Sequence, residues 1–260
     1  MMTFSYAMYP DLVDKRVVIT GGGSGIGAAF VEAFAQQGAQ VTFLDIAADA
    51  GAALQEKLKN AKYPPQFVAC DLTDLNAVAK VFADIHKRVG ATEVLVNNAA
   101  NDLRHNMANM TSEKWDANIA VNLKHLYFCS QAVVPGMQSA GGGAIINLGS
   151  ISWHLALPNL TLYMTAKAGI EAMTRGMARD FGASNIRVNC IIPGAVKTPK
   201  QTLLWHTPEA EIKIFNGQCL KIRVEPEDVA AMALFLASQS AAKCTGREYY
   251  VDAGNYGDGA

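Results

Sequence analysis

The stretch Thr20-Gly-Gly-Gly-Ser-Gly-Ile-Gly27 decides the fold of this chain. It follows a β-branched run, residues 15–20, that is typical of a buried strand, and it opens a segment, 25–37, with apolar residues at helical spacing. Glycines at a strand–turn–helix junction permit a sharp turn and a close approach of the backbone to a bound group. The free N–H groups of the helix N-terminus attract an anion. We therefore expect a dinucleotide pyrophosphate to bind here, at Gly21, Ser24, Gly25, Ile26 and Gly27.

Strand and helix patterns alternate along the rest of the chain. Strands are expected at 40–44, 66–70, 93–96, 143–148, 186–191 and 248–251. Helices are expected at 48–58, 75–89 (capped by Thr73 or Asp74), 112–138 in one or two pieces, 160–182, and 227–238 (capped by Pro226). Residues 193–217 are expected to be irregular or to contain short helices. The alternation predicts one α/β domain over residues 1–260: a Rossmann-type, doubly wound parallel sheet of about seven strands with helices on both faces.

The composition excludes several classes of protein. Of 260 residues, 50% are hydrophobic and 17% charged, which is globular. The 22 Lys and Arg against 23 Asp and Glu leave no basic excess for a nucleic acid or an anionic membrane. Five scattered cysteines indicate neither a disulfide framework nor a metal site. The first ten residues lack a signal-peptide pattern and no apolar stretch is long enough to span a membrane, so we expect a soluble, cytoplasmic protein.

Carboxylates end the second and third expected strands. Asp45, 18 residues after Gly27, can accept hydrogen bonds from an adenosine ribose and would repel a 2′-phosphate. No Lys or Arg lies between Gly21 and Asp45, which favours NAD over NADP. The alternative is that Asp45 only caps the next helix. Asp71 can bind the adenine amino group, or it is simply a turn carboxylate. Expected contacts here are Asp45, Ile46, Asp71 and Leu72.

A reactive group is expected from three residues later in the chain. Tyr163 and Lys167 are four apart and share one helix face. A nearby ammonium favours the phenolate and lowers the tyrosine pKa, which would make Tyr163 a general base near neutral pH. Ser150 can hydrogen-bond the reacting oxygen. A Tyr-x-x-x-Lys pair by itself more often marks an exposed helix face, so its meaning depends on the residues around it.

Taken together, these motifs resemble the short-chain dehydrogenase/reductase family over nearly the whole chain. The family's glycine motif matches residues 20–27, and its Asn-Asn-Ala-Gly matches Asn97-Asn-Ala-Ala100, with alanine replacing the last glycine. Its serine matches Ser150, 13 residues before Tyr163. The remaining matches are the Tyr163–Lys167 pair, Asn122, Pro193-Gly194 and Thr198.

The resemblance implies a role for each matching residue. Tyr163 is the acid/base, Lys167 binds the nicotinamide ribose and lowers the tyrosine pKa, and Ser150 stabilises the developing alkoxide. Asn122 holds a water in a proton relay. The implied contacts to NAD also include Asn98, Ala99, Tyr163, Lys167, Pro193, Gly194, Val196 and Thr198. The family further implies a homotetramer or homodimer, with interfaces from 112–138, 160–182 and the last strand.

The substrate is suggested by a narrower resemblance, to bacterial NAD-dependent aldose 1-dehydrogenases. The similar stretches are 16–27, 97–105, 149–154, 165–171 and 244–254. This implies transfer of a hydride from C1 of a cyclic aldose (such as D-xylose, L-arabinose, D-galactose or L-fucose) to NAD, giving a lactone. A polyol needs many hydrogen-bonding groups. The candidate substrate residues are Asn101, Ser150, Ser152, His154, Tyr163 and Trp205, under a lid at 195–217.

Alternatives remain open at this point. A sugar acid or 2-keto-3-deoxy sugar acid needs a cation, and Arg104, Lys197 and Lys200 lie near the expected mouth. An acyl-chain or steroid substrate needs more apolar surface than Trp153 and the leucines after it provide. A non-catalytic NAD-binding regulator is disfavoured, because Asn122, Ser150, Tyr163 and Lys167 are all retained.

Overall fold

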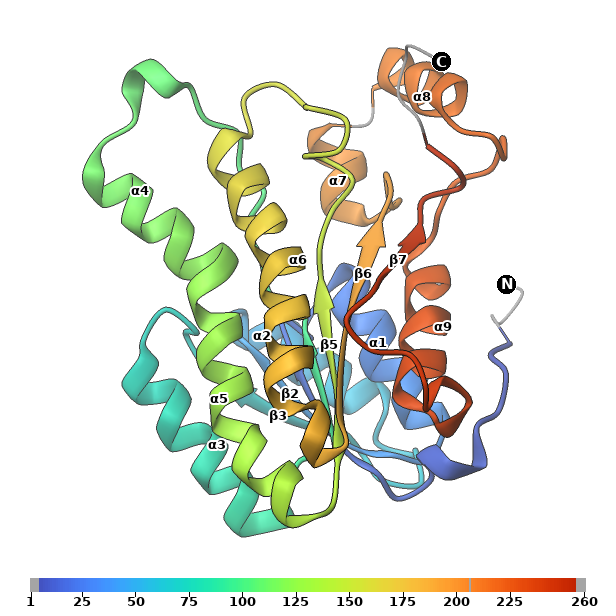
Figure 1. Cartoon of the computed structure of the whole chain (residues 1–260). Coiled ribbons are helices and arrows are strands. Elements are labelled where there is room, and N and C mark those ends of the chain that lie inside the picture. The colour runs from blue at the N-terminus through green and yellow to red at the C-terminus, as the bar shows by residue number, and fades with distance from the viewer. Residues whose placement is uncertain (1–4, 206, 256–260) are drawn as a thin grey trace.

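The expected parallel sheet is present in the structure, a computed structural model that describes residues 5–205 and 207–255 (Figure 1). The expectations for the first four residues, for residue 206 of the lid and for the last five residues lie outside this range. The strands are β1 Arg16–Thr20, β2 Gln40–Asp45, β3 Gln66–Ala69, β4 Val94–Asn97, β5 Gly143–Leu148, β6 Ile186–Pro193 and β7 Glu248–Val251. They form one seven-stranded sheet in the order β3-β2-β1-β4-β5-β6-β7, with every neighbouring pair parallel.

Helices cover both faces of the sheet. They are α1 Gly25–Gln36, α2 Ala48–Lys57, α3 Leu75–Val89, α4 Ser112–Ile119, α5 His125–Ser139, α6 Thr161–Phe181, α7 Pro199–Leu204, α8 Pro208–Gly217 and α9 Pro226–Ala237. Successive strand residues point to opposite faces, so Val17 and Ile19 pack with α1, α2 and α9, while Val18 packs with α3 and α5. The near-continuous apolar runs of the strands follow from this burial on both faces.

The chain order reverses between β1 and β4, and this point is held by polar contacts. The Asn98 side-chain amide donates to the carbonyl oxygens of Thr20 and Gly21 at 3.1 and 2.9 Å. The Asn98 backbone N–H donates to Thr20 Oγ1 at 3.0 Å. These bonds fix the glycine-rich turn against the end of β4. Ligands of doubly wound sheets bind at such a reversal, outside the carboxyl ends of the strands.

The helix expected at 112–138 is continuous but contains an irregular turn. Residues Ala120–Lys124 form a π-helical turn between α4 and α5, and Asn122 lies within it. A π-helical turn holds one residue more than the α-helix it interrupts, and such turns are frequent at functional sites. The sequence pattern indicated the helix but not this turn.

The helix termini correct one expected cap and decide between two alternatives for another. Pro226 does not cap α9: it is the first helical residue, and Glu225 is the N-cap. The Asp228 carboxylate accepts the Glu225 backbone N–H at 2.8 Å, which completes a capping box. Asp74, and not Thr73, caps α3, accepting from the N–H groups of Asn76 and Ala77.

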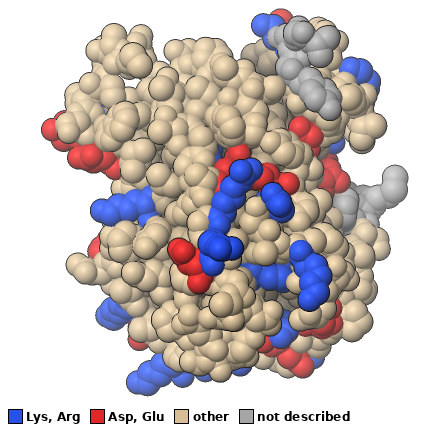
Figure 2. All heavy atoms as spheres, in the orientation of Figure 1, with Lys and Arg blue, Asp and Glu red and all other residues tan. Residues whose placement is uncertain are grey.

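Charges of both signs are interspersed on the face that carries α4, α5 and α6, and neither sign forms a broad surface there (Figure 2). Elsewhere in the described chain several charges are paired: Glu93 contacts both Lys15 and Arg16, and Arg175 contacts Glu248. Across the described part of the chain, no helix combines the length and the apolar character needed to cross a membrane.

Candidate active site

A cavity of about 1220 Å³ lies at the carboxyl edge of the sheet and is lined in part by α7 and α8. It is lined by the ends of β1 to β6 and by α6, which brings together residues far apart in the sequence. The predicted site residues that line it are Gly21, Ser24, Gly25, Ile26, Gly27, Asp45, Ile46, Asp71, Leu72, Asn98, Ala99, Asn101, Ser150, Ser152, Tyr163, Lys167, Pro193, Gly194, Val196, Thr198 and Trp205. Two predicted residues, Asn122 and His154, do not line it.

The glycine-rich turn has the shape that a pyrophosphate requires. Gly21 and Gly25 have φ of +65° and +55°, which other residues rarely adopt. A Cβ on Gly27 would lie 1.8 Å from the Gly21 carbonyl oxygen, so the helix packs on the turn without room for a side chain. The Ser24 side chain makes no capping bond to the first turn of α1. The N–H groups at this helix start are therefore free to face an anion in the cavity.

Asp45 lines the cavity and also bonds to the backbone. Its Oδ2 accepts the Gly23 N–H at 2.8 Å and its Oδ1 accepts the Ala47 N–H at 2.9 Å. Both expected roles are therefore compatible, because each carboxylate oxygen has a second lone pair. The basic residues that line the cavity come from the loop after β4 and from α6, α7 and α8. None comes from the first glycine-rich turn or from the ends of β2 and β3.

Asp71 is a turn carboxylate that lines the cavity as well. Its Oδ1 accepts from the Thr73 hydroxyl at 2.7 Å and from the Thr73 N–H at 2.9 Å. These two hydrogen bonds hold the pKa of Asp71 below its usual value. The carboxylate is thus charged and oriented at neutral pH, next to the predicted adenine position.

Lys167 is fully buried beside Tyr163 on α6. Its Nζ donates to the Leu148 carbonyl at 2.7 Å and lies 5.4 Å from the centre of the Tyr163 ring. Burial lowers the pKa of Lys167 to about 8, against the attraction of Cys190, Asp102 and Glu171. An ammonium that loses its proton this easily can exchange protons near neutral pH.

The pKa of Tyr163 differs from the expectation. Burial and the nearby Asp102 carboxylate raise it above the ordinary value, while a hydrogen bond from Ser150 lowers it. The prediction that Lys167 lowers the tyrosine pKa is therefore wrong for the chain alone. The physical reason is that the loss of solvation outweighs an ammonium that is directed at a backbone carbonyl.

Two serines follow β5 at the centre of the cavity. The Ser150 hydroxyl accepts the Ser152 N–H at 3.1 Å and lies near enough to Tyr163 to lower the pKa of the phenol. Ser152 is 4% exposed, and its Oγ has no hydrogen-bond partner among the residues described. A buried hydroxyl without a hydrogen-bond partner destabilises the folded protein, and a ligand that pairs with it removes this cost. The Ser152 hydroxyl is therefore available to a bound group, and its contact with a substrate stays a prediction.

Asn122 does not line the cavity, but its side chain binds the backbone of Asn101, which does. Its Oδ1 accepts the Asn101 N–H at 2.8 Å, and its Nδ2 donates to the Asn101 carbonyl at 3.0 Å. This reciprocal pair fixes the backbone of the loop after β4. The implied role of Asn122 in holding a water stays a prediction.

Residues of the predicted lid contact the same loop. Lys200 of α7 donates to Asp102 Oδ1 at 2.7 Å, and Gln201 contacts the other carboxylate oxygen. The Arg104 guanidinium lies 4.5 Å from the centre of the Trp205 ring, a cation–π contact. Burial would raise the pKa of Asp102, but the hydrogen bond and charge of Lys200 hold it below its usual value. The cavity is thus closed on one side by two charged contacts.

Comparison with known proteins places the chain in a family. The model of a family described as "Enoyl-(Acyl carrier protein) reductase" matches residues 21–255. A solved structure of a short-chain type dehydrogenase/reductase from Mycobacterium ulcerans superposes with a TM-score of 0.89 at 25% identity, covering 95% of this chain and 90% of that one. The chain belongs to the short-chain dehydrogenase/reductase family. Dehydrogenases of this family are oxidoreductases that use a nicotinamide cofactor.

Two family members with assigned names are similar over almost their full lengths. A D-xylose 1-dehydrogenase of Caulobacter vibrioides is 57% identical, covering 96% of this chain and 99% of that protein. A protein named "Probable galactose dehydrogenase GalD" from Rhizobium meliloti is 45% identical, covering 97% of this chain and 99% of that protein. Similarity at this coverage includes the cavity-lining loops as well as the cofactor motifs.

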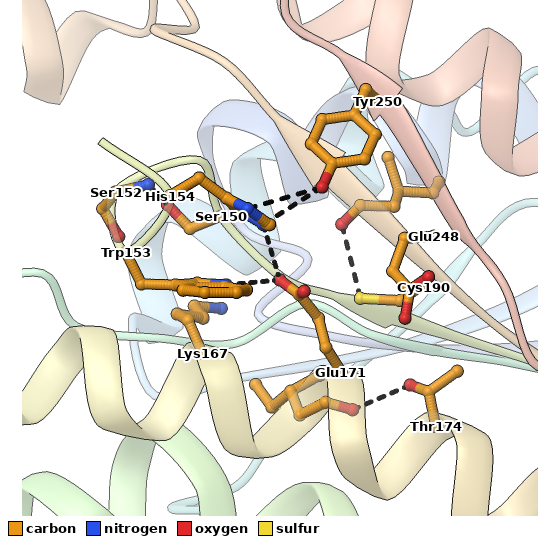
Figure 3. A network of polar contacts seen from close by, with 12 residues as sticks. Ser150, Ser152, Trp153, His154, Lys167, Glu171, Thr174, Cys190, Glu248 and Tyr250 are labelled. Carbon is orange, nitrogen blue, oxygen red and sulfur yellow. Dashed lines mark hydrogen bonds and ion pairs between the residues drawn. The ribbon is translucent and has the colours of Figure 1, made fainter. Parts of the chain in front are cut away.

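His154 is placed differently from the expectation that it binds substrate. It lies beside the cavity, on the turn after Ser150, and its ring faces α6 and β7 (Figure 3). Its Nε2 lies 3.3 Å from Glu171 Oε1 and 3.2 Å from the Tyr250 hydroxyl. Spacing after a strand end indicated that His154 is near the site, but the direction of its side chain depends on partners that are distant in sequence.

Sequence reasoning missed His125, which lines the cavity from the start of α5. Its Nε2 lies 3.1 Å from the Ala99 carbonyl oxygen, and burial lowers its pKa to about 4, so the ring is neutral. Its position three residues after Asn122, on the same helical segment, was the available signal. Lys213 of α8 also lines the cavity and was not predicted.

Proposed function

We propose that this protein is an NAD-dependent aldose 1-dehydrogenase that oxidises a cyclic sugar at C1 to the lactone. The observation that supports it most is that Ser150, Tyr163 and Lys167 line the same cavity as the glycine-rich turn and Asp45. The similarity to a D-xylose 1-dehydrogenase at 57% identity and to a named galactose dehydrogenase at 45% supports the sugar substrate. D-Xylose is the first substrate to test, followed by L-arabinose, D-galactose and L-fucose.

The reaction requires that C1 lose a hydride while its hydroxyl loses a proton. The nicotinamide ring of NAD, when bound, supplies the hydride acceptor. Tyr163 takes the proton of the anomeric hydroxyl, and Ser150 donates a hydrogen bond to the same oxygen as negative charge develops on it. Lys167 offers a positive charge beside the phenol, 5.4 Å from the centre of its ring, and burial lowers the pKa of this ammonium to about 8. The C1–O bond becomes a carbonyl, and the lactone then hydrolyses in water to the aldonic acid.

NAD rather than NADP is supported by the charges around Asp45. This carboxylate is already oriented by two backbone N–H groups, and its free lone pairs can accept ribose hydroxyls. A 2′-phosphate would meet a negative charge with no basic residue from the neighbouring strand ends that line the cavity. The protein should therefore reduce NAD far faster than NADP at equal concentration.

The remainder of the cavity is suited to a polyol. Besides the unpaired Ser152 hydroxyl, it presents the polar groups of Asn101, Asp102 and Gln201. Trp205 supplies a flat apolar wall, since its ring lines the cavity with Arg104 on one face. Hydrogen-bonding groups that would stay unpaired with an apolar alcohol give selectivity for a hydroxylated substrate.

The test is NADH formation by the purified protein on a panel of aldoses, sugar acids and one hydrophobic secondary alcohol, with NADP in parallel. Turnover on one or more aldoses with NAD, abolished in Ser150→Ala, is the expected result. Detection of the lactone by trapping with hydroxylamine separates oxidation at C1 from oxidation at another carbon. Turnover on the hydrophobic alcohol alone would contradict the proposal.

A sugar acid, including a 2-keto-3-deoxy sugar acid, is the second candidate, and one observation favours it. Arg104, Lys200 and Lys213 all line the cavity and can attract a carboxylate. Lys200 is already paired with Asp102, and Arg104 lies against Trp205, so the attraction of these two is partly used within the protein. Activity confined to the sugar acids of the panel, lost in Lys213→Met, would favour this candidate.

We also propose a homotetramer or homodimer in the cytoplasm. Trp115 of α4 and Tyr127 of α5 are 46% and 50% exposed, and Tyr250 of the edge strand β7 is 48% exposed. Exposed aromatic side chains of this size favour burial between subunits.

All five cysteines are free, which fits a reducing compartment such as the cytoplasm. Sedimentation of the purified protein tests the first proposal, and cell fractionation tests the second.

A further inference from the structure

A polar network joins the turn after Ser150 to the helix that carries Tyr163. Figure 3 shows Trp153 and His154 on that turn, with Glu171 of α6 below them and Tyr250 of β7 above. The Trp153 indole N–H donates to Glu171 Oε1 at 2.7 Å, and His154 Nε2 lies 3.3 Å from the same oxygen. The short length of the first bond is typical of a donor paired with a charged acceptor.

Glu171 is buried directly behind the serine segment. It is 7% exposed and lies one helical turn after Lys167 and two turns after Tyr163. A Cβ built on Gly149 would come within 3.2 Å of Glu171 Oε1, so the carboxylate lies close to the backbone just before Ser150. Glu171 therefore approaches this segment on both sides of Ser150, at Gly149 and at Trp153.

Two side chains of α6 thus hold the segment that carries the serine. Lys167 binds the Leu148 carbonyl before Ser150, and Glu171 binds the Trp153 indole after it. Ser150 lies between these two attachments in the chain, and its hydroxyl is near enough to Tyr163 of the same helix to lower the pKa of the phenol. Movement of the turn relative to α6 would change the distance between the serine and the tyrosine, and rates depend steeply on such distances.

We propose that Glu171 is a positioning residue: by binding the Trp153 indole, it fixes the Ser150 hydroxyl against Tyr163. Glu171 and Trp153 do not line the cavity, so they act without touching the sugar. The proposal rests on the proposed function, since its main readout is aldose oxidation.

Four variants separate this role from a purely structural one. Glu171→Leu and Trp153→Phe each remove one partner of the hydrogen bond, and Glu171→Gln keeps an oxygen that can accept it. Arg175→Met is the matched control, because Arg175 lies one turn further along α6 and pairs with Glu248 at the surface. Each variant is first checked for thermal stability and for NADH binding by fluorescence.

We expect Glu171→Leu and Trp153→Phe to lower kcat by roughly tenfold to a hundredfold, with KM for the sugar changed by no more than about threefold. The double variant should be no worse than Glu171→Leu alone, because both substitutions break the same Trp153–Glu171 hydrogen bond. Glu171→Gln and Arg175→Met should stay within about threefold of the parent. A sugar deuterated at C1 should give a larger isotope effect on kcat in Glu171→Leu, since hydride transfer becomes slower relative to product release.

Three results would overturn the proposal: a folded Glu171→Leu protein with the parent kcat, a loss in Glu171→Gln equal to that in Glu171→Leu, or strictly additive losses in the double variant. Equal losses in Glu171→Gln and Glu171→Leu would assign the loss of kcat to the missing negative charge of Glu171 alone. Failure of the proposed function looks different, since the unmodified protein would then fail on every aldose. If it oxidises another alcohol of the panel, the same variants are measured on that alcohol.

Discussion

At the scale of single residues, burial acts in opposite directions on the two groups at the centre of the cavity. It raises the pKa of Tyr163 and lowers that of Lys167 to about 8. The pair is therefore expected to lose its first proton near pH 8, where Lys167 titrates. The form with a phenolate and an ammonium contains the same number of protons as the neutral pair. It is populated only after this first loss.

The first prediction concerns pH. The value of kcat/KM for sugar oxidation should rise with pH through about 8 and then level, because below that pH both groups keep their protons and no base is available. The measurement is a pH–rate profile between about pH 6 and pH 10. Tyr163→Phe should lower kcat by about 10²–10⁴ at every pH while still binding NADH. A flat profile in the parent protein would contradict the assignment.

The second prediction concerns Asp45. Asp45→Asn keeps an oxygen for the Gly23 N–H but removes the negative charge, so NAD should bind about tenfold more weakly and NADP should bind better. Dissociation constants of NADH and NADPH, measured by fluorescence, give the ratio. Asp71→Asn is the control, because this substitution should weaken the binding of NADH and of NADPH to the same extent. An unchanged ratio in Asp45→Asn would leave Asp45 as a turn residue only.

A site residue could be predicted from the sequence where the local backbone sets the direction of its side chain. Tyr163 and Lys167 lie on a helix, where spacing sets direction, and both line the cavity. Ser150 follows a buried strand at the edge where ligands bind. His154 lies on an irregular turn, and its direction is set by Glu171 and Tyr250, which no local pattern reveals. The pKa of Tyr163 was misjudged because its burial depends on packing from several elements.

At the scale of elements, the loop after β4 and the lid helix α7 meet through one carboxylate. Asp102 pairs with Lys200 and also raises the pKa of Tyr163 by charge repulsion. The lid lysine therefore neutralises a charge that acts on the general base. The position of α7 relative to this loop therefore affects the acidity of the phenol.

The third prediction uses that coupling. Lys200→Met removes the cation paired with Asp102, which should move the midpoint of the pH–rate profile to higher pH, whereas Asp102→Asn should move it to lower pH. Both variants loosen the lid, so both should raise KM for the sugar by about threefold to tenfold. Opposite shifts of the midpoint identify the charge effect, and shifts of the same sign would exclude it.

The ends of the elements were less predictable than their existence. The strands and the long helices follow from apolar periodicity, and the structure confirms them within a few residues. The cap of α9 was assigned to Pro226, although Glu225 and Asp228 form a reciprocal box whose geometry the spacing only allows. The turn at Ala120–Lys124 depends on the bonds of Asn122 to the loop after β4, so it is a tertiary feature.

At the scale of the whole molecule, the fold divides the cysteines by depth. Cys70, Cys129 and Cys190 are buried, Cys244 is half-buried, and Cys219 is exposed. Burial raises the pKa values of Cys129 and Cys190 to about 12, so their thiolates are rare at neutral pH. Reactivity toward a disulfide reagent should therefore report on the integrity of the whole fold.

The fourth prediction follows from this division. In the native protein Cys219 should react first and Cys244 more slowly, while the three buried thiols should react only as the protein unfolds in denaturant. Release of the reagent's chromophore, with and without urea, measures this. Cys219→Ser should remove the fast phase and leave the rest unchanged. Fast labelling of Cys129 or Cys190 under native conditions, located by mass spectrometry, would contradict the packing described.

The π-helical turn at Ala120–Lys124 makes the chain sensitive to length at this point. Loss of one codon here would let α4 and α5 join as an unbroken α-helix and would rotate α4 by about 100° relative to α5. Asn122 would then lose its hydrogen bonds to Asn101, although nearly every side chain and the hydropathy profile would be preserved. A mutation that deletes a single codon in this stretch should therefore disturb the structure far more than most substitutions on the exposed surface of α4.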